Sequence, residues 1–244
     1  MDDPEPGTYA DTVADLYDSW FGSMLEAAPA ADRLAELAGS GPVLELGIGT
    51  GRVALPLAER GIEIHGIDGS AAMVAQLRAK PGGHDIPVTV GDFSEARVEG
   101  SFALVFAVAG TFFELQSQDA QVRCFQNAAR HLRPGGLFVL DALVPNVGTT
   151  NEDIRLIPSE EDRLMLRLRQ FDAVQQRYSS YYLIFDGGTS RHIRVSFRYA
   201  WPSELDLMAR IAGLRLRDRW SSWDAKPFTA SSKMHVSVYE RVPE

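Results

Sequence analysis

Three glycines at alternate positions follow an apolar stretch early in the chain, in LELGIGTGR at residues 44–52. Gly47, Gly49 and Gly51 keep the backbone clear of side chains, which a turn needs when a ligand lies directly against it. Two carboxylates end later apolar stretches, Asp68 in GIDGS and Asp92 in VTVGDF. The two oxygens of Asp68 can accept hydrogen bonds from both hydroxyls of a ribose. These residue types therefore predict a nucleoside site at the carboxyl ends of parallel strands.

The spacing of the glycines separates one kind of nucleotide from another. A G-x-G-x-x-G loop for a dinucleotide would need a third glycine at position 52, where this chain has Arg52. The observed pattern is E-x-G-x-G-T-G, with Glu45 at the strand end. It resembles the loop of the class I S-adenosylmethionine-dependent methyltransferases. Within that superfamily, VLELGIGTGRVALPLAERG followed by GIDGSAAM is similar to actinobacterial small-molecule methyltransferases, including N-methyltransferases of nucleotide-linked amino sugars.

The resemblance implies S-adenosyl-L-methionine as the cofactor and a role for each matching residue. Glu45 orients the glycine turn or reaches the methionyl ammonium through water, Asp68 binds the ribose, and Asp92 with Phe93 binds the adenine. Tyr17 lies where relatives place an aromatic side chain against the methionyl part, and an aromatic face stabilises a sulfonium cation. The expected cofactor-binding residues are Tyr17, Glu45, Gly47, Gly49, Gly51, Asp68, Gly69, Met73, Asp92, Phe93 and Ala107.

Each of these features also has a purely structural interpretation. A glycine turn occurs in many α/β proteins, Asp68 can cap the segment GSAAMVAQL, and Asp92 can cap the short turn FSEA. Tyr17 can belong to the apolar stripe of a packed helix. Three sites at the ends of three successive strands, in the order that a nucleoside requires, favour the binding interpretation.

The acceptor side is less defined, and the sequence identifies no catalytic residue. In amino-sugar N-methyltransferases the loop after the fourth strand tends to carry a histidine, whereas this chain has AVAGTFFELQS, which favours a more apolar or aromatic acceptor. Positioning and desolvation can supply most of the acceleration, so a base is optional. The expected acceptor-binding residues are aromatic: Trp20, Phe112, Tyr182, Tyr199 and Trp201.

The elements needed to position these residues follow from periodicity. Apolar runs at 42–46, 62–68, 88–90, 102–109 and 137–143 alternate with amphipathic helical runs at 53–61, 70–80 and 117–132. This predicts an α/β fold, a doubly wound, mostly parallel, seven-stranded Rossmann-like sheet. Residues 1–40 form a helical lid with helices over 9–28 and 30–41, residues 41–145 the cofactor-binding core, and residues 146–201 an antiparallel insertion that caps the substrate. That insertion has strands over 163–172, 177–188 and 190–201, and a helix and two closing strands occupy 202–244.

The charge is unevenly distributed along the chain. The net charge is −9, but residues 163–219 hold 11 Lys and Arg against 5 Asp and Glu. The overall sign argues against nucleic acid as a partner. Within the insertion, Arg167, Arg169, Arg194 and Arg198 could bind a carboxylate or phosphate of the acceptor, or form a self-association surface against the acidic body, so a homodimer is left open.

The remaining features concern compartment and activity class. The polar, acidic N-terminus and the absence of a long apolar stretch argue against secretion and membrane insertion. Cys124 is the only cysteine, which predicts no metal centre and suits a reducing cytoplasm. We expect a methyltransferase of secondary-metabolite type that modifies nitrogen. The alternatives are C- or O-methylation of an aromatic molecule, or a regulator that binds the cofactor without transfer.

Overall fold

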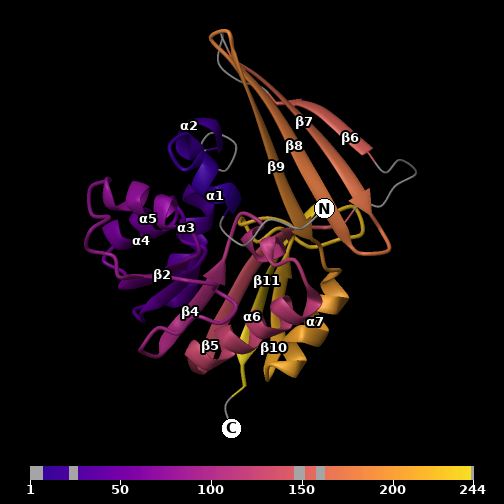
Figure 1. The fold of residues 1–244 in the computed structure, drawn as a ribbon. Helices are drawn as coiled ribbons and strands as arrows, with labels where there is room; N and C mark the ends of the chain where they lie inside the picture. The colour runs from indigo at the N-terminus through magenta and orange to yellow at the C-terminus, as the bar shows by residue number, and fades with distance from the viewer. Residues whose placement is uncertain (1–7, 22–26, 146–151, 158–162, 243–244) are drawn as a thin grey trace.

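A seven-stranded sheet forms the body of the protein. The computed structural model describes residues 8–21, 27–145, 152–157 and 163–242. The strand order is β10-β11-β5-β4-β1-β2-β3, and β11 and β10 at one edge run antiparallel to their neighbours (Figure 1). The strands are β1 Val43–Leu46, β2 Ile64–Asp68, β3 Val88–Val90, β4 Phe102–Ala107, β5 Leu132–Leu143, β10 Leu214–Trp220 and β11 Met234–Arg241. The predicted fold class is therefore confirmed.

Helices cover both faces of this sheet. One face carries α3 Ala28–Ala38 and α4 Ala54–Glu59. The other face carries α6 Gln118–His131 and α7 Pro202–Ile211. Along the chain, α5 Ala71–Arg78 connects β2 to β3. Strands covered on both sides read as continuous apolar runs rather than alternating ones. This explains why every residue of β1 and β4 is buried. The carboxyl ends of β1, β2, β3 and β4 meet at one edge of the body.

A separate four-stranded antiparallel sheet rises above that edge (Figure 1). Its strands are β6 Glu152–Ile157, β7 Arg163–Asp172, β8 Arg177–Asp186 and β9 Thr189–Arg198. The register places Met165, Ile184 and Val195 on the inner face, which packs toward the body. The prediction of three strands missed β6, which pairs with β7 as the outer strand.

Polar side chains anchor this sheet to the body where β9 ends. Arg198 lies in an ion pair with Glu204 of α7 at 2.8 Å, and its side chain is only 8 % exposed. It also donates a hydrogen bond at 2.5 Å to Gln121 of α6. Arg198 is therefore not placed to bind an acceptor or a second copy of the chain, because its buried guanidinium fixes the sheet on two helices.

The N-terminal segment is broken into short helices rather than one long helix. α1 Thr8–Val13 and α2 Tyr17–Phe21 are separated by a turn at residues 14–16, and α3 follows after the undescribed residues 22–26. Val13 and Ala14 are buried against Met73 of α5 and against the inner face of the four-stranded sheet. Both short helices therefore lie beside the edge where the strand ends meet (Figure 1). None of the helices described here is long and apolar enough to cross a membrane.

Candidate functional site

A cavity of about 490 Å³ lies where the glycine loop after β1 meets the ends of β2 and β3. Gly49 lines it in a left-handed conformation with φ of +54°, and a Cβ built there would meet no atom within 4 Å. The open space beside Gly49 is therefore room for a ligand. Gly47 differs, because a Cβ at this position would come within 2.4 Å of Thr111 Cγ2 in the loop after β4. The loop thus serves two purposes, contact with a ligand and close packing.

Asp68 joins the end of β2 to the glycine loop. Its Oδ2 accepts a hydrogen bond from the Gly49 N–H at 2.6 Å, and its Oδ1 accepts one from the Ser70 N–H at 2.8 Å. Ser70 is the N-cap of α5, so Asp68 does not itself cap that helix. Burial raises the pKa of the Asp68 carboxyl, and the two N–H donors oppose the rise. The oxygens of Asp68 keep further acceptor capacity at the cavity wall.

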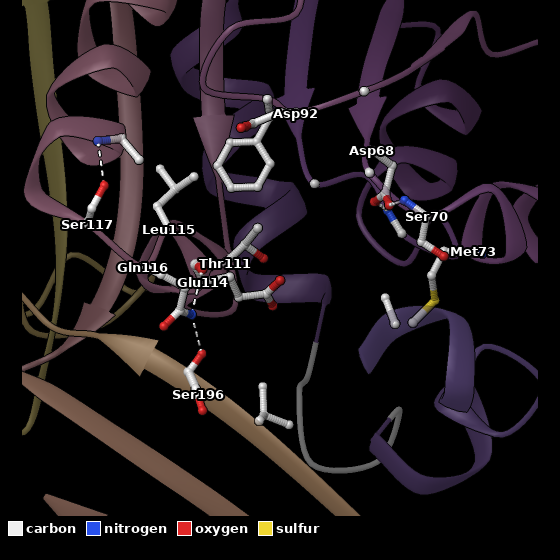
Figure 2. Close-up of a pocket in the computed structure, with 18 of the residues that line it drawn as sticks. Asp68, Ser70, Met73, Asp92, Thr111, Glu114, Leu115, Gln116, Ser117 and Ser196 are labelled. Atoms are coloured by element: carbon white, nitrogen blue, oxygen red, sulfur yellow. Dashed lines mark hydrogen bonds between the residues drawn. The ribbon is translucent and has the colours of Figure 1, made fainter. Parts of the chain in front are cut away.

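The far end of the cavity is bounded by residues after β3. Asp92 Oδ1 accepts a hydrogen bond from the Ser94 N–H at 2.8 Å, which realises the capping interpretation of this carboxylate. Asp92 also lines the cavity, together with Phe93 and Met73. Figure 2 shows Asp68, Ser70 and Met73 on one side of this space. Met73 and Phe93 thus provide apolar walls here, with the Asp92 carboxylate among them.

Most of the expected cofactor-binding residues come together here, and three do not reach the cavity surface. The cavity is lined by Tyr17, Gly47, Gly49, Asp68, Gly69, Met73, Asp92 and Phe93. Gly51 packs against Leu77 instead, and Ala107 is completely buried in β4. Glu45 is 2 % exposed behind the loop, its Oε2 has no hydrogen-bond partner, and burial raises its pKa well above the usual range.

A second cavity of about 450 Å³ lies between the ends of β4 and β5 and the inner face of the four-stranded sheet. Aromatic side chains of its walls are Phe113, Tyr178, Tyr182 and Phe197, and charged side chains line it as well. Asp141 also lines it, but its two oxygens accept hydrogen bonds from the Gly110 N–H and from Trp223 Nε1, each at 3.0 Å. Both oxygens of Asp141 are therefore used in hydrogen bonds, one of which fixes the loop after β4.

Three side chains line both cavities: Tyr17, Glu114 and Val195. They form a common wall, and Figure 2 shows Glu114 projecting into the space between the loop after β4 and the Asp68 side. Burial raises the pKa of Glu114 to about 7, and the negative charge of Asp68 adds to the rise. The residue as a whole is exposed, and its side chain can contact whatever occupies the two cavities. Burial also raises the pKa of Tyr17 to about 12, which keeps its phenol neutral.

Sequence reasoning missed Glu114. It ends the 3₁₀ helix η2 Thr111–Glu114, directly after two phenylalanines that are completely buried. The signal was available, since a charged residue beside buried aromatics at the carboxyl end of a central strand faces either solvent or a site.

The aromatic residues expected around the acceptor are only partly brought together. Tyr182 lines the second cavity. Phe112 is completely buried against Phe125, and Tyr199 is 1 % exposed beneath the four-stranded sheet. Trp201 precedes α7 and lines neither cavity. Trp20 belongs to α2, and its side chain lies outside the described part of the structure.

The N-terminal segment contacts the glycine loop through α2. Asp18 Oδ1 accepts a hydrogen bond from Thr50 Oγ1 at 2.6 Å, and Asp18 Oδ2 forms an ion pair with Lys80 at 2.5 Å. Lys80 also donates a hydrogen bond to the Thr50 carbonyl at 2.7 Å. These contacts place Tyr17 over the junction of the two cavities.

The chain is similar to known methyltransferases. A methyltransferase domain model matches residues 43–136. The chain is 31 % identical to the cypemycin N-terminal methyltransferase of a Streptomyces species, over 97 % of this chain and 99 % of that protein. It is similar to the structure of the methyltransferase CcbJ from Streptomyces caelestis, with a TM-score of 0.90, 38 % identity, and coverage of 97 % and 99 %. A calicheamicin amino pentose methyltransferase from Micromonospora echinaspora shares the fold, with a TM-score of 0.72, 20 % identity, and coverage of 93 % and 97 %.

Proposed function

We propose that this chain methylates an amino nitrogen of a small molecule. The premise is its family, because the chain belongs to the class I S-adenosylmethionine-dependent methyltransferases. The observation that carries the proposal is the common wall, where Glu114 lines both the cavity at the glycine loop and the second cavity. The relative named as an N-terminal methyltransferase supports the choice of nitrogen over oxygen or carbon, as does a sugar N-methyltransferase from a Streptoalloteichus species that shares the fold.

The residues of the first cavity fit the cofactor. The space beside Gly49 accommodates a ligand against the backbone, and the carboxylate of Asp68 supplies an acceptor for ribose hydroxyls. S-adenosylmethionine supplies a methyl group on a sulfonium. Tyr17 offers the neutral aromatic face that stabilises such a cation by about 0.5–2 kcal/mol.

The acceptor amine must present a lone pair in line with the methyl carbon. Glu114 attracts the ammonium form, takes its proton on a carboxylate oxygen, and leaves the neutral amine facing the first cavity. The bound cofactor would supply the methyl group to that nitrogen, and the electron pair of its carbon–sulfur bond would remain on sulfur. A carboxyl with a pKa of about 7 is a better proton acceptor than an ordinary glutamate near neutral pH.

The test is a search for the methylated atom. Incubation with S-adenosylmethionine and pooled amines, phenols and thiols, followed by fragmentation mass spectrometry, is expected to give N-methyl products. Products methylated only at oxygen or carbon would overturn the choice of nitrogen and favour the aromatic acceptor that the walls also suit.

Three further expectations belong to this proposal. The acceptor is a small molecule rather than a nucleic acid, the enzyme works in the cytoplasm, and it is able to form a homodimer. The acidic net charge supports the first of these.

A further inference from the structure

We infer that the acceptor carries an anionic group, a carboxylate or a phosphoryl group, close to the amine, and that Arg167 and Arg169 of β7 bind it. This inference rests on the proposed function, because it names the acceptor class of the same site. The feature behind it is a cavity with an acidic side chain on one wall and two arginines on another.

The two arginines share the inner face of the four-stranded sheet. Residues two apart on a strand point to the same side, about 6.5–7 Å from each other. Arg167 pairs in register with Tyr182, and Arg169 with Ser180, which also belong to the inner face. Both arginines line the second cavity, whereas Arg194 lies on the other face of the sheet, over the Tyr181 ring. β7 thus presents its two arginines to the second cavity beside Tyr178 and Tyr182 of β8, whereas Arg194 of β9 lines the first cavity.

Arg169 is held in a fixed orientation. Its Nε donates a hydrogen bond to Ser180 Oγ at 3.2 Å, and its Cζ lies 5.3 Å from the centroid of the Tyr178 ring. The terminal nitrogens Nη1 and Nη2 then present the planar fork that matches the two oxygens of a carboxylate or phosphate. A stacked guanidinium loses less side-chain freedom on binding an anion than a mobile one.

The charges on the two walls are close enough to act on one small molecule. Burial is the main cause that raises the pKa of Tyr178, and the charges of Arg169, Arg167 and Glu114 all act on the same phenol. A cavity of about 450 Å³ is within the range that holds small ligands. An amine at Glu114 and an anionic group at the arginines would complement both walls at once.

The test compares acceptors that differ only in the anionic group. Calorimetry on the protein saturated with S-adenosylhomocysteine would use L-phenylalanine, its amide, 2-phenylethylamine and the aminophosphonate analogue of phenylalanine. We expect the carboxylate or the phosphonate to bind at least tenfold more tightly than the amide and the amine. The anion that binds more tightly shows whether the acceptor carries a carboxylate or a phosphoryl group.

Variants separate binding from support of the sheet. Arg169→Ala and Arg167→Ala should each remove the preference for the anion and leave the affinity for the amide unchanged, whereas Arg169→Lys should restore part of it. Arg191→Ala, on the same sheet but lining neither cavity, should keep the preference. Loss of amide and anion binding in equal measure would show that the arginines only support Tyr178.

The outcomes distinguish this inference from the proposed function. Equal binding of all four probes, or binding of none, overturns the inference even if amines are methylated. Methylation at oxygen or carbon, with the preference for the anion intact, overturns the proposed function and retains the anion site.

Discussion

Asp68 gives the most direct residue-level test of the cofactor site. Asp68→Ala removes a charged acceptor for ribose hydroxyls, so we expect binding of S-adenosylmethionine to weaken by about 1.5–3 kcal/mol, roughly 10- to 150-fold. Isothermal calorimetry measures the change. Asp68→Asn keeps an acceptor for the Gly49 N–H and should lose less. Equal affinity of Asp68→Ala and the parent protein would remove Asp68 from the site.

Gly49 tests whether open space beside the loop is used by the ligand. Gly49 and Gly187 have φ of +54° and +53°, and a Cβ at either position would meet nothing within 4 Å. Alanine at either should therefore cost a similar 1–2 kcal/mol of stability, roughly, from backbone strain. Only Gly49→Ala should also weaken cofactor binding, by tenfold or more, because only Gly49 lines the cavity. Matched melting temperatures with unchanged binding would contradict the role of Gly49.

Glu114 predicts the pH dependence of the reaction. Its pKa is raised to about 7, so the carboxylate that attracts an ammonium is present only above that pH. We expect kcat/KM to rise with pH up to about 7. Glu114→Gln should lower kcat/KM and abolish this rise with pH. A profile that keeps the same rise in the variant would assign it to another group.

The raised pKa of Glu114 also makes the stability of the fold depend on pH. Stability falls over the pH range in which kcat/KM is expected to rise. Because the folded state holds the proton more tightly than the unfolded chain, stability is lost as pH rises from about 4.5 toward 7. The melting temperature of Glu114→Gln relative to the parent should increase across that interval. A constant difference would show that the pKa of Glu114 is not raised.

Among the helices, α1 and α2 are the elements expected to respond to the cofactor. Their contact with the glycine loop depends on a few polar groups, chiefly Asp18 with Thr50 and Lys80. We expect amide exchange over residues 13–21 to slow when S-adenosylmethionine binds, since closure excludes water. Asp18→Ala should reduce this protection, whereas Asp15→Ala, at an exposed position in the turn before α2, should not. Unchanged exchange at saturating cofactor would indicate that both helices are fixed.

Periodicity predicted the strands of the body and three strands of the smaller sheet, because their burial is regular. It failed where tertiary contacts override local pattern. Extending the alternation of β9 to Tyr199 and Trp201 was wrong, since β9 ends at Arg198 and the chain turns into α7. Phe112 lies in the core because η2 rotates it away from the cavity and leaves Glu114 facing it, and an unrecognised 3₁₀ turn hides that rotation from the sequence.

The complete chain presents an apolar outer face on the four-stranded sheet. Ile154 is 70 % exposed and Leu156 61 %, with Leu164 and Phe185 beside them on the same face. Such a patch is typical of an interaction surface, and a two-fold dimer would cover it symmetrically. We expect Leu156→Asp to lower the sedimentation coefficient of the protein, and Val174→Asp, in the β7–β8 turn, to leave it unchanged. Equal coefficients for the parent and both variants would contradict a dimer through this face.

The wall shared by the two cavities also constrains the order of events in turnover. Tyr17, Glu114 and Val195 contact whatever fills either cavity, so the first molecule to bind shapes the surface that the second one meets. Since α2 is tied to the glycine loop, the nucleoside compartment is the one whose occupation positions Tyr17. Steady-state kinetics should therefore be sequential and ordered. S-adenosylhomocysteine should compete with S-adenosylmethionine and inhibit noncompetitively against the amine, and the methylated amine should leave first.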